Sequence, residues 1–197
     1  MKTMPVSELL GIGTARPITR WGTPVLHSPG RPVVDFGSEL QELLADMFAT
    51  NAAANGAGLA AAQIGVDVAV FIYDCADETG TRRTGVVCNP VIELIEGIDR
   101  RLVDYGEGCL SLPGAHAELA RPDFATCRGQ DQYGEPIEIT AGGTLGRCLQ
   151  HETDHTNGMV FGDRLSKRKR KQLYRDHEQA AGEYPAEWPA RSPHREN

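Results

Sequence analysis

The hydrophobic residues between positions 38 and 55 recur at intervals of three and four. Leucine, methionine and phenylalanine occupy positions 40, 43, 44, 47 and 48, which share one face of a helix. Ser38 and Gln41 have the spacing of a capping box at a helix start, and Gly56 is a residue type that commonly ends a helix. The pattern therefore predicts an N-terminal helix over about residues 38–55.

Shorter runs rich in β-branched and aromatic residues follow, separated by Gly, Pro and Asp. Runs of this length and composition are typical of strands. They cover residues 68–73, 85–95, 101–105, 124–128 and 137–140. Residues 129–136 have the composition of a hairpin connection, which favours antiparallel pairing of the two runs around it.

Two more helices are predicted in the C-terminal part of the chain. One begins near residue 143, has apolar positions on one face, and ends at Asn157 and Gly158, a favourable helix terminus. The other contains the basic run 167–171 and the residues after it. Together the elements predict an α+β fold with antiparallel β-sheets packed around a central helix, an N-terminal helix and a C-terminal helix.

Length and composition favour one domain. The chain has 197 residues, of which 40% are hydrophobic, enough to bury a core without disulfides. The first residues carry loop signals, and the last ones are rich in proline and poor in aliphatic residues. We expect an N-terminal arm over residues 1–17, a single domain over 18–181, and a disordered tail over 182–197.

Charge, cysteine content and apolar run length limit the partners. The formal net charge is −7, whereas nucleic-acid-binding proteins commonly have a basic face. The five cysteines are spread singly without a C-x-x-C pair, as is usual in a reducing compartment. No stretch approaches the roughly 18 apolar residues that a membrane helix needs. We therefore expect a cytoplasmic protein without a DNA or membrane partner.

His151, Glu152 and His155 form an H-E-x-x-H string on the predicted central helix. Residues four apart lie on the same helix face, so both imidazole rings can reach one metal ion while Glu152 lies beside its open position. This arrangement suits metal-assisted hydrolysis. The alternative is a solvated helix that carries two unrelated histidines.

A catalytic divalent ion typically takes three protein ligands, so the two histidines need a partner. Glu178, on the predicted C-terminal helix, would make the site resemble that of zinc endopeptidases. Cys109 lies in an E-G-C-L-S-L-P stretch, where glycines on both sides of Glu107 permit unusual backbone angles and close approach. Cys148 shares the histidines' helix and is better placed to pack in the core. The residues alone leave Glu178 and Cys109 open as the third ligand.

Three stretches resemble, in order and spacing, the motifs of peptide deformylases. They are G-A-G-L-A-A-A-Q at residues 56–63, E-G-C-L-S-L-P at 107–113, and Q-H-E-T-D-H at 150–155 with Gly158. The resemblance covers about residues 18–174. It implies a hydrolase that removes the formyl group from the N-terminal formylmethionine of new bacterial polypeptides and releases formate, a step of N-terminal methionine processing in protein biosynthesis.

The resemblance also implies a role for each matching residue. The metal ligands would be Cys109, His151 and His155. Glu152 would act as general base and then as general acid, while the Gln63 side-chain amide and the Leu110 backbone N–H would stabilise charge on the formyl oxygen. The substrate-binding residues would be Ala57, Gly58, Gly108, His116, Arg147 and Cys148.

The metal and the partners follow from the same resemblance. A cysteine and two histidines suit both Fe²⁺ and Zn²⁺, and the resemblance implies Fe²⁺ as the native ion, with Ni²⁺, Co²⁺ or Zn²⁺ able to replace it. An extended formylmethionyl peptide is expected to approach the backbone closely at Gly58 and Gly108. The run 167–171 would face the ribosome near the nascent-chain exit, although a solvated helix face is the alternative. We expect a monomer.

The chain departs from the family pattern at three positions. Ala62 replaces a common proline, Thr156 a common leucine, and His116 an arginine that contacts substrate in several members. We expect the first two to affect local packing. The third weakens the predicted contacts with the peptide beyond its methionine.

Overall fold

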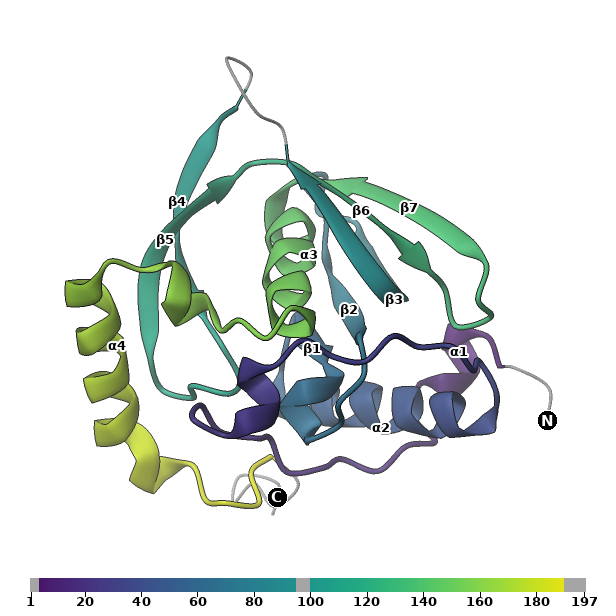
Figure 1. Cartoon of the computed structure of the whole chain (residues 1–197), viewed down its shortest axis with the longest axis horizontal. Helices are drawn as coiled ribbons and strands as arrows, with labels where there is room; N and C mark the ends of the chain where they lie inside the picture. The colour runs from purple at the N-terminus through teal and green to yellow at the C-terminus, as the bar shows by residue number, and fades with distance from the viewer. Residues whose placement is uncertain (1–3, 95–99, 190–197) are drawn as a thin grey trace.

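A computed structural model describes residues 4–94 and 100–189 of the chain. Its strands form two antiparallel sheets (Figure 1). The larger sheet has the order β1-β2-β3-β6-β7, from β1 (Gly58–Ala60), β2 (Val70–Ala76), β3 (Arg82–Leu94), β6 (Ala125–Gln130) and β7 (Pro136–Ala141). The smaller sheet pairs β4 (Leu102–Gly108) with β5 (His116–Pro122). The predicted antiparallel α+β arrangement is confirmed.

The helix α3 (Gly143–Thr156) lies between the two sheets (Figure 1). One of its faces, which includes Leu145 and Leu149, packs in a hydrophobic cluster with Phe71 of β2. Nearly all of its residues from Leu145 onward are buried, because strands surround the helix. It begins and ends as predicted, and Asn157 caps its C-terminus.

The helix α2 (Ser38–Ala54) buries its predicted apolar face, with Met47 fully enclosed. The expected capping box of Ser38 and Gln41 is wrong. Gly37 precedes the first helical residue, and no side chain caps that end. Gln41 turns inward instead, because its side-chain amide donates a hydrogen bond of 3.0 Å to the buried carbonyl of Gln132.

The C-terminal end of α2 differs from the prediction by one residue. Asn55 adopts the left-handed conformation (φ 53°) that was expected of a glycine beyond the helix. Gly56 is needed for space rather than for its backbone angle, since a Cβ there would lie 2.2 Å from Asn51 Oδ1. The chain therefore turns from α2 into β1 within a few residues, and the G-A-G-L-A-A-A-Q stretch begins in this turn.

The five predicted strand runs correspond to β2, β3, β4, β6 and β7, with ends shifted by a few residues. Residue 95, the last of one predicted run, lies outside the described residues. The strands β1 and β5 were not predicted from the pattern. Both lack β-branched residues, so pairing with β2 and β4 rather than local propensity makes them strands.

The remaining helical elements connect these parts. The predicted C-terminal helix is α4 (Lys167–Ala180), which buries Leu173. Ser166 caps its N-terminus, since the Ser166 hydroxyl accepts a hydrogen bond from the Lys169 N–H. The short helices are α1 (Val6–Leu9), η1 (Pro24–His27), η2 (Ala61–Ile64), η4 (Phe161–Arg164) and η5 (Ala181–Glu183). Within residues 4–94 and 100–189, no helix is long and apolar enough to cross a membrane.

Both ends of the chain pack more closely than the sequence pattern suggests. In the expected N-terminal arm, Leu9 of α1 is fully buried and joins the core cluster that contains α2. Of the segment expected to be a disordered tail, residues 182–189 are described, and the Trp188 carbonyl accepts a 2.9 Å hydrogen bond from the Ile18 N–H. Tyr184 and Trp188 give this proline-rich segment an apolar surface to pack. Residues 190–197 lie outside the described part.

Candidate metal centre

Cys109, His151 and His155 bring one sulfur and two imidazole rings together. Their ligand atoms all lie within 4.8 Å of one another, and Cys109 Sγ is 3.2 Å from His155 Nε2. All three side chains are buried. A thiolate with two imidazoles is a donor set that binds divalent transition metals, so these residues fit the metal ion that the sequence predicts.

The local structure explains how the ligands meet. His151 and His155 are one helical turn apart on α3, and their ring centroids are 5.0 Å apart. Cys109 comes directly after β4, whose last residue is Gly108. Gly108 has no positive φ, so the predicted unusual backbone angle is wrong. A side chain would not fit at position 108, because a Cβ there would lie 2.7 Å from His116 Nε2.

Glu107 orients the first histidine. His151 Nδ1 donates to Glu107 Oε1 at 2.7 Å, which leaves the other ring nitrogen for a metal ion. Arg121 of β5 donates to both carboxylate oxygens, at 2.6 and 2.8 Å, and Arg147 of α3 donates to Oε2 at 2.9 Å. Burial acts to raise the pKa of Glu107, but the hydrogen bonds from Arg121 and His151 outweigh burial and hold its pKa far below the usual range.

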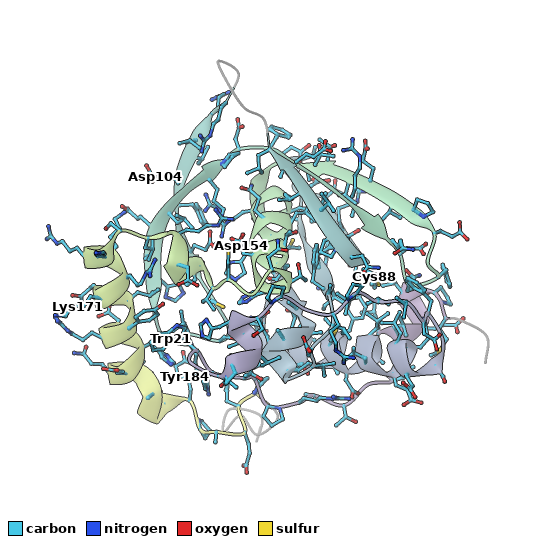
Figure 2. All side chains as sticks on the ribbon, in the orientation of Figure 1. Trp21, Cys88, Asp104, Asp154, Lys171 and Tyr184 are labelled. Atoms are coloured by element: carbon cyan, nitrogen blue, oxygen red, sulfur yellow. The ribbon has the colours of Figure 1, made fainter. Side chains whose placement is uncertain are left out.

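Asp154 extends this buried network along α3. It accepts from Arg121 Nη1 at 3.0 Å and from Arg164 Nε at 2.6 Å, and Arg164 Nη2 contacts its other oxygen. Figure 2 shows Asp154 in the interior beside α3. Neither Arg121 nor Asp154 was identified from the sequence as part of the site. Arg121 lies on β5, which the pattern did not reveal, although Asp154 lies inside the recognised helix motif.

Glu152 is buried beside the ligands, with a side chain that is almost unpaired. Among the described residues, its Oε2 has no hydrogen-bond partner. Burial raises its pKa to about 7, and the nearby His151 opposes this rise. A carboxyl group with a pKa near neutral can both accept and donate a proton under ordinary conditions, as a general acid–base group must.

Gln63 of η2 points its amide nitrogen at the sulfur of the cluster. The Ala60 N–H donates to Gln63 Oε1 at 2.9 Å and so fixes which end of the amide turns inward. Gln63 Nε2 then lies 3.6 Å from Cys109 Sγ and 3.5 Å from Ser111 Oγ. Leu110 follows Cys109 in the chain, so its backbone N–H belongs to the peptide group directly after the metal-binding cysteine.

A cavity of about 350 Å³ contains nearly all the predicted site residues. Its lining includes Ala57, Gly58, Gln63, Gly108, Cys109, Leu110, His116, Arg147, Cys148, His151 and Glu152. His155 is not part of the lining and lies deeper, against Cys109. Tyr105, Tyr184 and Trp188 also line the cavity, and none of them was predicted from the sequence.

Gly58, Arg147 and Thr156 each make contacts within the protein. Gly58 leaves room for two side chains of α3, because a Cβ there would lie 2.6 Å from Cys148 Sγ and 3.0 Å from Glu152 Cγ. Arg147 lines the cavity and also pairs with Glu107. Thr156 satisfies its buried hydroxyl by donating to the Thr153 carbonyl at 2.9 Å.

Glu178 does not join the metal ligands. It lines a second cavity beside α4, together with Trp21 and Tyr174. The group of metal-binding side chains described above contains Cys109 and not Glu178. The arrangement therefore gives no support to a zinc endopeptidase site of the kind considered from the sequence.

Comparisons with known proteins agree with this geometry. The family model described as polypeptide deformylase matches residues 15–171. The chain is 55% identical to peptide deformylase 1 of Streptomyces avermitilis over 173 residues, which are 88% of this chain and 80% of that protein. It is 49% identical to peptide deformylase 2 of the same organism over 154 residues, 78% of this chain and 81% of that one.

Solved structures show the same fold. The crystal structure of a peptide deformylase from Legionella pneumophila is similar with a TM-score of 0.75 and 37% identity, covering 86% of this chain and 96% of that one. A structure from Synechococcus elongatus in complex with actinonin has a TM-score of 0.74 and 30% identity, covering 90% and 91%. With the family match and these relatives, the chain belongs to the polypeptide deformylase family.

Proposed function

We propose that Cys109, His151 and His155 hold one divalent metal ion and that Glu152 transfers the proton during hydrolysis. The enzyme is a metal-dependent hydrolase that removes the N-formyl group from nascent chains, as its family does. The observation that carries the residue assignment is the convergence of three buried ligand side chains beside a carboxyl group whose Oε2 has no partner among the described residues.

The chemistry assigned to the chain is acid–base catalysis beside the metal. When bound, a divalent ion lowers the pKa of water and polarises a carbonyl oxygen. Glu152 accepts a proton from the attacking water and then delivers it to the departing amine, which becomes the new N-terminus. Glu152 is only 4% exposed, so bulk water has little access to this carboxyl group.

Gln63 and Leu110 are the proposed donors to the formyl oxygen. The charge on this oxygen grows during attack, and donors that already point at it need no rearrangement. The bond from Ala60 to Gln63 Oε1 supports this role, since it turns the amide N–H groups toward the site. Loss of one such donor typically raises the barrier by about 3 to 4 kcal/mol.

The proposed ion in the cell is Fe²⁺, with Zn²⁺, Ni²⁺ and Co²⁺ as possible replacements. The mixed sulfur and nitrogen donors suit each of these ions and do not suit Mg²⁺ or Ca²⁺, which prefer oxygen. Elemental analysis of protein purified without oxygen tests the choice, and the proposal expects about one equivalent of iron. Zinc in protein prepared from iron-replete cells without oxygen would contradict it.

The substrate is proposed to lie in an extended conformation between β1 and β4. The strand β1 is at the edge of the larger sheet, and β4 pairs with β5 on one side within the described part of the chain. Both strands contribute to the cavity lining through Gly58 and Gly106. An exposed strand edge can bind a peptide backbone whatever its side chains are, so one site can serve many nascent chains.

Formate release from formyl-Met-Ala-Ser, after iron loading without oxygen, tests the function. Glu152→Gln should lose activity by roughly 10²- to 10⁴-fold while still binding the metal, because the substitution removes proton transfer and keeps the ligands. Glu178→Gln is the matched control and should retain both metal and activity. Loss of metal from Glu178→Gln, or full activity of Glu152→Gln, would contradict the assignment.

A second proposal concerns where a monomeric, cytoplasmic enzyme meets its substrate. A cavity of about 450 Å³ beside α4 is lined by Lys167, Arg170, Lys171, Tyr174, Arg175, Glu178 and Trp21. Trp21 and Tyr174 stack with centroids 3.8 Å apart, and Lys171 lies on the outer side of the helix (Figure 2). On a chain with a net charge of −7, this basic face is suited to ribosomal RNA phosphates.

Co-sedimentation with ribosomes at low and moderate salt tests the docking proposal. The variant Lys167→Glu/Lys171→Glu should sediment less, because both side chains line the basic cavity. Arg168→Glu is the control. It also reverses one positive charge on α4, but Arg168 does not line this cavity. Equal sedimentation of all three proteins would refute docking through this face.

A further inference from the structure

Two aromatic side chains from the C-terminal segment complete the lining of the catalytic cavity. Tyr184 and Trp188 both face it, and their rings meet edge to face with centroids 5.3 Å apart. Each side chain is only partly buried, so part of its surface remains available to a ligand. The family match ends at residue 171, and these two residues lie beyond it. We call them the aromatic wall.

Hydrogen bonds to the N-terminal part of the chain hold the aromatic wall in place. The Ile18 N–H donates to the Trp188 carbonyl at 2.9 Å. The Arg20 guanidinium donates to the carbonyls of Tyr184 and Pro185, at 3.1 Å each, and lies 5.4 Å from the centre of the Trp188 ring. Arg20 is not among the residues that line the cavity, so the wall contributes neutral aromatic side chains to that lining.

The same N-terminal stretch is bonded to two catalytic motifs. The Thr19 N–H donates to the Gln63 carbonyl at 2.8 Å, and the Trp21 N–H donates to the Ser111 carbonyl at 3.0 Å. Residues 18–21 therefore connect the aromatic wall, the proposed oxyanion donor and the loop after the metal-binding cysteine. The position of the wall relative to the reacting centre is fixed by backbone bonds.

The end of α4 fixes the wall from the other direction. Gly114, in the loop after Cys109, has a φ of +79°, and a Cβ there would lie 2.3 Å from Ala180 Cβ and 3.2 Å from a ring carbon of Tyr184. His177 Nδ1 lies 3.1 Å from the Pro113 carbonyl. The loop thus packs directly against the end of α4, and Tyr184 follows η5, the short helix after α4 (Figure 2).

We propose that Tyr184 and Trp188 form a subsite for an apolar or aromatic side chain of the substrate, downstream of its formylmethionine. The proposal rests on the proposed function, in which the metal ligands and Glu152 hold the formyl end. Side chains further along an extended peptide then meet other parts of the same cavity. Neutral aromatic rings bind apolar and aromatic groups through burial and edge or face contacts.

The test compares kcat/KM for three substrates in the iron-loaded full chain: formyl-Met amide, formyl-Met-Ala-Ala and a peptide with Phe at the second or third position. The wild type should prefer the Phe peptide. In Trp188→Ala, the ratio of kcat/KM for the Phe peptide to that for formyl-Met amide should fall about tenfold, mainly through KM, since about one aromatic contact is lost. Trp188→Phe should restore most of the ratio.

Controls separate this role from a structural one. Tyr133→Ala removes an exposed aromatic residue outside the cavity lining and should leave the ratio unchanged. If Trp188→Ala folds poorly, Tyr184→Ala and Trp188→Leu provide the same comparison. An equal loss for all substrates, or an unchanged ratio in every wall variant, would overturn the subsite. An inactive wild type with its metal bound would instead contradict the proposed function.

Discussion

Glu107 shows how much of the site depends on a residue outside the metal ligands. Its carboxylate accepts from His151, Arg121 and Arg147, so one side chain joins β4, β5 and α3. The sequence could identify the two histidines, because their types and spacing suit a metal, and the resemblance to peptide deformylases added Cys109. It could not identify Arg121, because a buried arginine has no local pattern that distinguishes it from a solvated one. Only the fold brings its partner carboxylates within reach.

For this single residue we predict that Glu107→Gln weakens metal affinity about 10- to 100-fold, because the ring of His151 loses the carboxylate that orients it. The free energy of unfolding should also fall by about 3 to 5 kcal/mol, since Arg121 keeps only one buried carboxylate partner. Competition with a chelator and denaturant titration measure the two effects.

Glu93→Gln is the control for this substitution. Its carboxylate pairs with Arg128 at the surface and is more than half exposed, so the expected change in stability is below about 1 kcal/mol. Wild-type metal affinity in Glu107→Gln would show that His151 needs no such support.

The helices were the easiest elements to predict and the short strands the hardest. The periodicity of α2 and the motif and terminal Asn-Gly of α3 are local signals, and both helices lie close to their predicted limits. The strand β1 has only three residues, and β5 contains no β-branched residue, so their pairing depends on contacts distant in sequence. These two strands carry Gly58 and Arg121, which explains why the roles of both residues required the structure.

Gly58→Ala tests how closely β1 must approach α3. Its Cβ would lie 2.6 Å from Cys148 Sγ and 2.9 Å from the Ile72 carbonyl oxygen, so the strand or the helix must move. We expect a loss of about 1 to 3 kcal/mol in the free energy of unfolding, measured by thermal or denaturant unfolding. Gly106→Ala is the strand control, because no atom lies within 4 Å of its added Cβ. Equal stability of the two variants would mean that β1 does not pack tightly on α3.

At the scale of the whole molecule, the site joins segments from most of the chain. Its ligands come from α3 and the end of β4, Gln63 comes from η2, and the aromatic wall comes from the C-terminal segment. Composition predicted a well-packed protein, but not that Trp188 would pair with Ile18. A proline-rich sequence gives a weak local signal, and the hydrogen bonds that hold this segment come from residues about 170 positions away.

Metal removal should therefore lower the stability of the entire protein. A ligand present at 100 times its Kd stabilises a folded protein by about 2.7 kcal/mol, which for a chain of this size corresponds to roughly 5 to 10 °C in Tm. We expect a shift of this order between the metal-loaded protein and the chelator-treated protein. Cys109→Ala should show a much smaller shift. An identical Tm with and without metal in the wild type would argue against a site that couples α3 to β4.

The most direct measurement is X-ray absorption spectroscopy at the metal edge of the loaded enzyme. For the zinc-loaded enzyme we predict one sulfur neighbour at about 2.3 Å and nitrogen neighbours at about 2.0 to 2.1 Å. In Cys109→Ser the sulfur shell should disappear while both histidine nitrogens remain. A wild-type spectrum with only nitrogen and oxygen neighbours, or a sulfur shell that persists in Cys109→Ser, would contradict the proposed metal centre.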